Sequence, residues 1–248
     1  MKAGVSIGLC SLLTLLAASG CATIPPELRD PRDPWEPFNR GVYRFNTDFD
    51  NAFLKPIAKG YQAVTPEPVD RGITNFFANI ADIRSAVNNL LQFKLTRASS
   101  DVGRIAVNST VGLLGFIDVA SNIGIPSYKE DFGQTLGYWG YSSGPFVMLP
   151  LLGPSSVRDT IGLGGDIAVD PFFSIREREV LWGAVGLRVV DARADLLSAE
   201  AVFDEAAVMD PYGFLRDAYL QRRRYLVHDG NPPPDEFELE LESWGEEE

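Results

Sequence analysis

The 248-residue sequence predicts a mainly helical protein. In four segments apolar side chains recur every three or four residues, which is the spacing of one face of an α-helix. Few segments alternate between apolar and polar residues, as half-buried strands would. Stretches rich in glycine and proline separate the periodic segments. The expected fold class is therefore all-α, with irregular connecting loops.

The N-terminus has the features of an export signal. Lys2 and an apolar run lead to residues 15–21, which read LLAASGC. Small residues before a cysteine let a peptidase approach the backbone, and the thiol is a natural acceptor for lipid. We expect a cleaved lipoprotein signal peptide over residues 1–20 and acylation of Cys21. An ordinary secretory signal with an incidental cysteine is the alternative.

Ala22 bears on where the lipidated chain resides. An aspartate directly after the lipidated cysteine tends to hold bacterial lipoproteins in the inner membrane, and this chain has alanine there. We expect an outer-membrane protein anchored in the periplasmic leaflet by diacylglycerol and an amide-linked chain such as palmitate. Each buried methylene contributes about 0.8 kcal/mol, so these chains together anchor firmly.

Composition divides the remainder into three parts. Residues 21–33 are rich in proline and charge and are expected to form a flexible tether, and residues 34–228 form the helical body. Residues 229–248 carry nine acidic residues and no Lys or Arg, and are expected to be a disordered, solubilising tail. The net charge of −12 therefore describes the tail more than the body. Nucleic-acid binding is disfavoured because no basic face can neutralise phosphates.

Capping and breaking residues set the expected helix boundaries. The first helix begins near Pro37 and ends at Pro56, because proline lacks an N–H. Asp70 is expected to cap the second helix, and Ser99 or Ser100 the third, which runs towards Leu113. The apolar stripes of these helices consist of Phe38, Val42, Phe45, Phe49 and Phe53; of Ile73, Phe76, Phe77, Ile80, Ile83, Val87 and Leu90; and of Val102, Ile105 and Ala106.

Two further helices are expected near the C-terminus. A long stripe predicts one helix from Leu181 to Phe203. Asp210-Pro211 opens the last helix, with Asp at the cap and Pro in the first turn. This helix closes with residues 222–224, three arginines, which favour the negative end of the helix dipole. They are expected to be a solvated helix end, with binding of lipid phosphates as the alternative.

Two irregular stretches carry almost no charge. Residues 105–127 contain one charged side chain, Asp118, and residues 133–157 contain none. Irregular apolar backbone at membrane depth occurs only where it packs in protein or lines a cavity. Two alternatives stay open for these stretches: a buried core loop, or a surface that faces lipid.

The pattern also limits how the protein could meet a bilayer. No apolar segment after Cys21 reaches the about 20 residues that spanning requires, and no series of alternating strands of about ten residues is present. Helices with apolar faces and regular charges fit a position within one leaflet, or packing against other proteins. A soluble helical bundle would show the same stripes.

The pentapeptide 140–144, GYSSG, fits the G-x-S-x-G pattern of a lipase nucleophile elbow centred on Ser142. Asp166 or Asp170, with His228, would complete a triad. An elbow needs a strand before the serine and a helix after it, whereas prolines and a glycine follow here. His228 borders the acidic tail, where a base is poorly held. We therefore expect no enzyme activity.

Metal and cofactor binding are not expected either. His228 is the single histidine, Cys10 leaves with the signal, and Cys21 carries lipid, so the usual zinc ligands and a disulfide are lacking. No phosphate-binding glycine loop follows a predicted strand.

Several ordered motifs resemble the MlaA family, also called VacJ. The residues DPWEPFNR at 33–40 and YRFN at 43–46 resemble the family's D-P-x-E-x-F-N-R…Y-x-F-N opening. The resemblance continues in these blocks: GFIDVA (115–120), FGQTLGYWGYSSGPFVMLP (132–150), SSVRD (155–159), DPY (210–212) and YLQR (219–222). It spans about residues 33–228, so the signal and the acidic tail lie outside it.

The resemblance implies an outer-membrane lipoprotein that removes mislocalised phospholipid from the outer leaflet and so maintains lipid asymmetry. It implies a ring of amphipathic helices in the inner leaflet around an amphipathic channel, association with trimeric porins, and transfer to a periplasmic lipid carrier. Two hypotheses follow. Gly112, Leu113, Leu114 and Gly115 form a gating hairpin, with close helix packing as the competing role; and the helix bearing Tyr43, Phe45, Asn46 and Phe49 closes the ring. A structural envelope lipoprotein that scaffolds porins is the alternative function, and a Ser142-dependent lipase is the third.

Overall fold

The structure of the protein is a computed structural model that describes residues 30–207 and 209–234. The predicted signal peptide and Cys21 lie outside the described residues, as do residues 235–248 of the tail. The elements are, in order, α2 (Glu36–Phe49), η2 (Asp50–Leu54), α3 (Lys55–Val64), α4 (Glu67–Leu91), α5 (Leu95–Thr110), α6 (Val119–Asn122), α7 (Phe132–Tyr138), β1 (Phe146–Leu149), β2 (Gly153–Ser156), α8 (Val157–Val169), η3 (Pro171–Ser174), α9 (Arg178–Leu196), α10 (Glu200–Ala206) and α11 (Pro211–Val227). The mainly helical fold class is confirmed.

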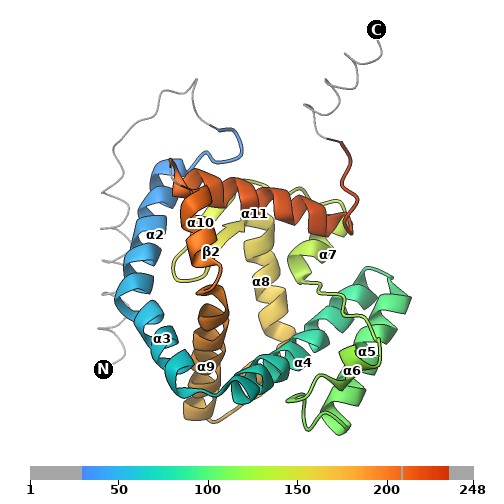
Figure 1. Cartoon of the computed structure of the whole chain (residues 1–248). Helices are drawn as coiled ribbons and strands as arrows, with labels where there is room; N and C mark the ends of the chain where they lie inside the picture. Colours follow the sequence, from blue (N-terminus) through green and yellow to red (C-terminus); the bar gives the residue numbers. More distant parts are fainter. Residues whose placement is uncertain (1–29, 208, 235–248) are drawn as a thin grey trace, which may run out of the picture.

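The long helices follow the outline of the molecule (Figure 1). The helices α2 and α3 form one side, α11 crosses the top and α4 crosses below, while α8 and α9 run between them. The helices α5 and α6 pack beside α4 as a separate group.

A short hairpin, which the sequence did not predict, provides the main apolar core. The strands β1 and β2 pair antiparallel, with Phe146 opposite Ser156. Phe146 and Met148 are buried against Val42 of α2 and Tyr212 of α11. Part of the uncharged stretch 133–157 is thus core, whereas its turn exposes apolar side chains, Leu151 and Leu152 among them.

The prediction that Pro56 ends the first helix is wrong. The chain continues in helical form to Val64 through the π-helical turn η2, in which the Lys55 N–H donates to the carbonyl of Asp50. Pro56 then occupies the first turn of α3. A π-turn thus absorbs the proline that would otherwise break the helix.

Two predicted helix caps are also wrong. The helix α4 begins a turn before Asp70, at Glu67, because Pro68 suits a first turn and the preceding Pro66 is extended. The helix α5 begins at Leu95, so Ser99 and Ser100 lie inside it. Their hydroxyls donate to the carbonyls of Thr96 and Pro126, at 2.8 Å each.

The long C-terminal stripe forms two helices rather than one. The helix α9 ends at Leu196 and α10 begins at Glu200, and the Ser198 hydroxyl donates to the Asp195 carbonyl at 3.3 Å. Such local bonding offers the backbone an alternative to the helix. The predicted start of α11 is confirmed, with Asp210 preceding and Pro211 in the first turn.

Candidate functional site

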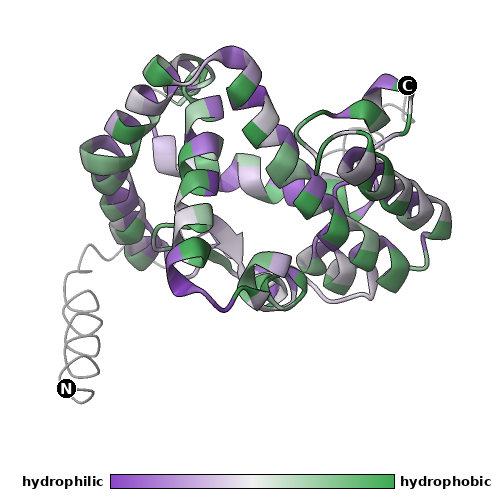
Figure 2. Cartoon of the chain, turned by 90° about the horizontal axis from the view of Figure 1, so that it is seen from below, coloured by the Kyte–Doolittle hydropathy of each residue, from purple (hydrophilic) through white to green (hydrophobic). Residues whose placement is uncertain are grey.

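The described part of the molecule has an inverted distribution of polarity. Of its buried residues, twenty are polar or charged and twelve are apolar or aromatic. The helix α4 buries the face that carries Asn79, Asp82, Ser85 and Asn88, while Leu90 of its apolar stripe is 56 % exposed. Figure 2 shows polar and apolar faces on the same helices. Soluble proteins rarely expose so many large apolar side chains, so these outer faces indicate contact with lipid or with other proteins.

A first polar network joins α4, α5 and α6 around Arg104. Its guanidinium donates to Asp82 at 3.0 Å, to the Ile125 carbonyl at 2.9 Å and to Asp118 at 3.2 Å. Burial raises the pKa of Asp82, although Arg104 opposes the shift. The pKa of Asp118 is instead lowered to about 2, because the effect of burial is outweighed by hydrogen bonds from Ser121 and Asn108 together with the charge of Arg104.

A second network connects α4 with α7 and α8. The Thr135 hydroxyl donates to the Asn88 side chain at 2.8 Å, and Asn88 donates to Asp166 at 3.3 Å. Gln92 donates to Glu130 and to Thr135, at 3.0 Å each. These buried amides and carboxylates satisfy one another, so they can be placed inside the molecule at little cost.

A third network joins α11 to the starts of α7 and α8. Arg223 donates to both oxygens of Asp131 and of Asp159, with Asp159 at 2.9 and 3.0 Å. Burial raises the pKa of Asp131, but the donated bonds of Arg223 outweigh it and lower the pKa to about 2. The expectation of a solvated arginine at this helix end is therefore wrong for Arg223, because its partners lie 64 and 92 residues away.

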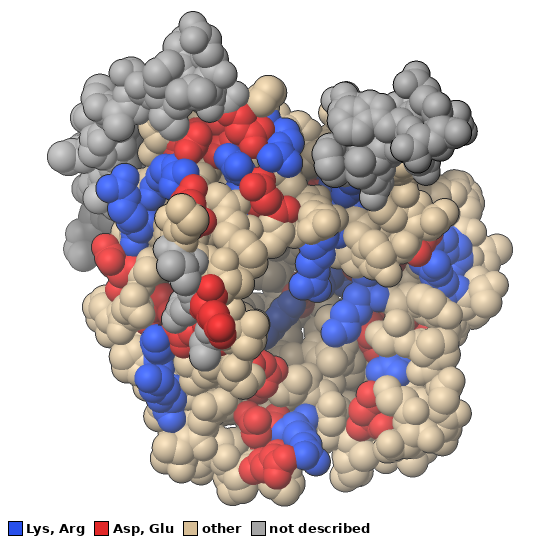
Figure 3. Space-filling model, turned by 45° about the horizontal axis from the view of Figure 1, so that its top comes forward, with Lys and Arg blue, Asp and Glu red and all other residues tan. Residues whose placement is uncertain are grey.

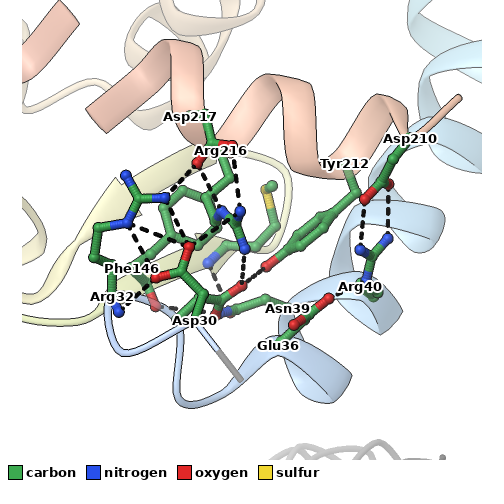
Figure 4. Close-up of polar contacts among 12 residues, drawn as sticks. Asp30, Arg32, Glu36, Asn39, Arg40, Phe146, Asp210, Tyr212, Arg216 and Asp217 are labelled. Atoms are coloured by element: carbon green, nitrogen blue, oxygen red, sulfur yellow. Dashed lines mark hydrogen bonds and ion pairs between the residues drawn. The ribbon is translucent and has the colours of Figure 1, made fainter. Parts of the chain in front are cut away.

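A fourth network fixes the start of the body against α11 (Figure 4). Asp33 is 1 % exposed and accepts a hydrogen bond from Asn39 at 2.7 Å and one from the Tyr212 hydroxyl. Arg32 donates to Asp30 and to Asp217 of α11. The last residues of the segment expected to be a tether thus pack on the C-terminal helix.

Two asparagines of α2 bind the hairpin as a neighbouring strand would. Asn39 donates to the Phe146 carbonyl at 3.1 Å and accepts from the Met148 N–H at 2.9 Å. Asn46 donates to the Leu149 carbonyl at 2.9 Å and accepts from the Leu151 N–H at 2.8 Å. These two residues are the asparagines of the opening motif, and this is their structural role.

The other predicted residues of this helix divide between two faces. Tyr43 and Asn46 line a cavity of about 530 Å³, together with charged residues of η2, α3, α9 and α10. Phe45 is 45 % exposed and stacks with Phe49 at 6.3 Å between ring centroids. The helix therefore lies between a cavity that contains charged side chains and an exposed outer surface that carries Phe45.

Residues 112–115 form a tight turn after α5. Leu113, Leu114 and Gly115 all have positive φ, and both leucines are about two-thirds exposed. A Cβ on Gly112 would lie 2.2 Å from the Ile117 carbonyl oxygen, and one on Gly115 would lie 2.6 Å from the Asn79 Cβ. A Cβ at either glycine would therefore collide with neighbouring atoms, and the two leucines are the exposed part of the turn.

The G-x-S-x-G segment is not built as a nucleophile elbow. It follows the helix α7 and precedes the strand β1, which reverses the required order. Ser142 and His228 both line a groove of about 990 Å³, but neither Asp166 nor Asp170 lines it. Asp166 accepts instead from the Phe132 N–H, and Asp170 accepts from Arg188.

No described helix is both long and apolar enough to cross a membrane. Within residues 30–207 and 209–234, no group of three or more metal-ligating side chains is placed to hold an ion.

Figure 3 shows a hollow in the middle of the molecule with basic side chains at its rim.

Comparison with known proteins places the chain. The model of the MlaA lipoprotein family matches residues 31–226. The chain belongs to the MlaA lipoprotein family. It is 32 % identical over 224 residues to the intermembrane phospholipid transport system lipoprotein MlaA of Escherichia coli K12, covering 88 % of this chain and 87 % of that one. The protein of the same description from Haemophilus influenzae is 31 % identical over 229 residues, covering 90 % of each chain.

A solved structure shares the fold as well. It is described as the structural basis for maintenance of bacterial outer membrane lipid asymmetry, and it matches with a TM-score of 0.70 at 30 % identity. The match covers 80 % of this chain and all of that one. The helices, the hairpin and the four polar networks described above thus belong to an MlaA-family fold.

Proposed function

We propose that this protein is an outer-membrane lipoprotein that moves mislocalised phospholipid out of the outer leaflet without a chemical reaction. Its relatives named above are phospholipid transport lipoproteins, and the related structure concerns outer-membrane lipid asymmetry. The observation that carries the proposal for this chain is the inverted polarity, with apolar faces outside and connected polar networks inside. Helices of this kind are stable where lipid tails surround them and polar groups bond internally.

In the proposed mechanism the helices form a ring within the inner leaflet around an amphipathic channel. An apolar wall receives acyl chains while charged side chains receive the head group, which lowers the barrier to moving a lipid between leaflets. Paired groups such as Arg193 and Asp50, at 2.7 Å, supply such a polar wall beside the cavity at α2. Direction would come from the partners, which we propose to be trimeric porins and a periplasmic lipid carrier.

We also propose roles for two parts of this channel, the turn at 112–115 and the helix α2. The turn at 112–115 gates the channel through its exposed leucines rather than through flexible glycines, since both glycines are packed. The helix α2 closes the ring by binding the hairpin through Asn39 and Asn46.

The test measures phospholipid exposed on the surface of cells that lack the protein. The cells are complemented with wild type, with Ser142→Ala, or with Val102→Glu, which places a charge on the outer face of α5 where Val102 is 58 % exposed. Val102→Leu, which keeps the same position apolar, is the matched control. Immunoblots verify equal abundance.

We expect accumulation in the null that wild type, Ser142→Ala and Val102→Leu reverse and that Val102→Glu reverses poorly. Rescue by Val102→Glu would contradict a lipid-facing surface on α5. Rescue by wild type but not by Ser142→Ala would indicate a lipase. No accumulation in the null would favour the structural, scaffolding role.

A further inference from the structure

The groove beside the G-x-S-x-G segment is not explained by the transport proposal. It lies between the loop 140–145, the helix α11 and residues 31–32, and its volume is about 990 Å³. Its described lining includes Arg32, Arg158 and Arg223, while Asp217 is the single acidic residue there. Each of these arginines donates to a carboxylate, and of those carboxylates only Asp217 lines the groove.

Ser143 provides a buried hydroxyl without a partner. Its Oγ is shielded from solvent, has no hydrogen-bond partner among the described residues and belongs to a residue that lines the groove. The Ser143 carbonyl accepts from the Arg158 N–H at 3.1 Å, which fixes this residue on the start of α8. A buried hydroxyl without a partner destabilises a fold, so its retention indicates an external partner.

The backbone around Ser143 supplies further donors. Within the described residues, the N–H groups of Ser142, Ser143 and Gly144 have no acceptor, whereas Tyr141 and Phe146 on either side donate to the carbonyls of Leu136 and Arg32. Gly140 and Gly144 both have positive φ and bend the loop at its two ends. Successive N–H groups in a bent loop form the kind of concavity that binds oxyanions.

Arg158 lies in the wall of the same groove and is 8 % exposed. Its Nε donates to Asp159 at 2.9 Å and its Nη2 forms an ion pair with the same carboxylate at 2.9 Å, and Asp159 is shared with Arg223. The Nη1 atom is therefore the nitrogen of Arg158 that could reach a ligand. The Nη1 atom lies against Gly137, where a Cβ would come within 2.9 Å of it. The glycine therefore leaves room for a guanidinium at this point of the wall.

We propose that this groove binds a phosphate group through the Ser143 hydroxyl, the N–H groups of residues 142–144 and Arg158. A tetrahedral phosphate has the several acceptor oxygens that this set of donors requires, and arginine is suited to binding it. The source of the phosphate is the head group of a phospholipid, and this assignment of the source rests on the proposed function. Inorganic phosphate offers the same acceptor oxygens, and the test distinguishes it from the lipid head group by using the two as separate probes.

The experiment uses the purified full-length protein in detergent and measures binding by calorimetry. The probes are a short-chain phosphatidylglycerol below its micellar concentration, its deacylated glycerophosphodiester, and inorganic phosphate. The variants are Ser143→Ala and Arg158→Gln, and Ser142→Ala is the matched control because its hydroxyl is exposed. Thermal unfolding of each variant is recorded without probe.

We expect the wild type and Ser142→Ala to bind the short-chain lipid alike. Ser143→Ala should weaken binding about tenfold, the loss expected for one hydrogen bond to a charged group, and Arg158→Gln by at least as much. Because Ser143→Ala removes only an unpartnered hydroxyl, its melting temperature should equal or exceed that of the wild type.

Three results would overturn the inference. They are equal affinity of Ser143→Ala and wild type, equal affinity of Arg158→Gln and wild type, and absence of binding by every probe. Binding of inorganic phosphate alone, weakened by both variants, would support the anion site and overturn the lipid source. The purified protein could bind phosphate while cells that lack it keep normal lipid asymmetry. That combination would contradict the proposed function and leave the anion site standing.

Discussion

Replacing Arg104 with leucine tests whether the polar interior behaves as a buried, mutually satisfied network. Arg104 and Asp82 are 5 % and 3 % exposed, and their side chains meet at 3.0 Å. The leucine leaves the Asp82 carboxylate without its cation, and Asp118 keeps only its neutral donors, Asn108 and Ser121. Removing one member of a buried pair costs about 3–5 kcal/mol. For a chain of this size that corresponds to a fall in melting temperature of roughly 10 °C.

The pH dependence separates lost charge compensation from a simple packing defect. Burial already raises the pKa of Asp82 above its unfolded value, and loss of Arg104 raises it further. A carboxyl whose folded pKa is raised destabilises the fold as pH rises from its unfolded pKa, near 4, through its folded pKa. The deficit of Arg104→Leu should therefore be large at pH 7.5 and smaller at pH 4.5.

The assay is thermal unfolding of the full chain in detergent, followed by circular dichroism at both pH values. Arg104→Leu combined with Asp82→Asn should recover part of the stability at pH 7.5, because the uncompensated charge is gone. An equal deficit at the two pH values, together with no recovery in the double variant, would refute the reasoning.

Three further predictions concern single contacts. Burial raises the pKa of Asp101 to about 6, so the contribution of this carboxyl to the unfolding free energy should fall by about 2 kcal/mol between pH 4 and 6, and the difference in unfolding free energy between wild type and Asp101→Asn should change by that amount in the same assay. Asn46→Ala removes both hydrogen bonds to the end of the hairpin and should cost about 1–3 kcal/mol, while the exposed neighbour Thr47→Ala should cost almost nothing; equal melting temperatures would contradict the role assigned to Asn46. Gly112→Ala and Gly115→Ala place a Cβ against neighbouring backbone or side-chain atoms and should each lower stability by about 2 kcal/mol or more; wild-type unfolding curves for both would restore a purely flexible role.

The helices of this fold could be predicted from the sequence because their amphipathic periodicity is strong. Their orientation could not, since a stripe such as that of α4 marks two unlike faces without saying which of them meets solvent, lipid or protein. For that reason the sequence alone does not distinguish a soluble helical bundle from helices that lie in one leaflet. The burial of Asn79 and Asp82 and the exposure of Leu90 favour the second.

Long-range polar partners were the features that sequence reasoning missed. Arg223 looked like a charged helix end because its carboxylate partners, Asp131 and Asp159, lie in distant segments. Asp33 was placed in a tether because its immediate neighbours are prolines and charges, whereas α11 buries it. Asn39 and Asn46 were visible as part of a motif, but the hairpin that they bind was not predicted.

The attachment of residues 30–33 to α11 limits how far the folded body can lie from its lipid anchor. If Cys21 is acylated as expected, eight residues separate the anchor from the docked Asp30. Even fully extended, such a segment reaches only about 30 Å, which is about the thickness of a bilayer's hydrocarbon core. A body confined within this radius meets the membrane at a high effective concentration, so even weak apolar contacts keep it seated there.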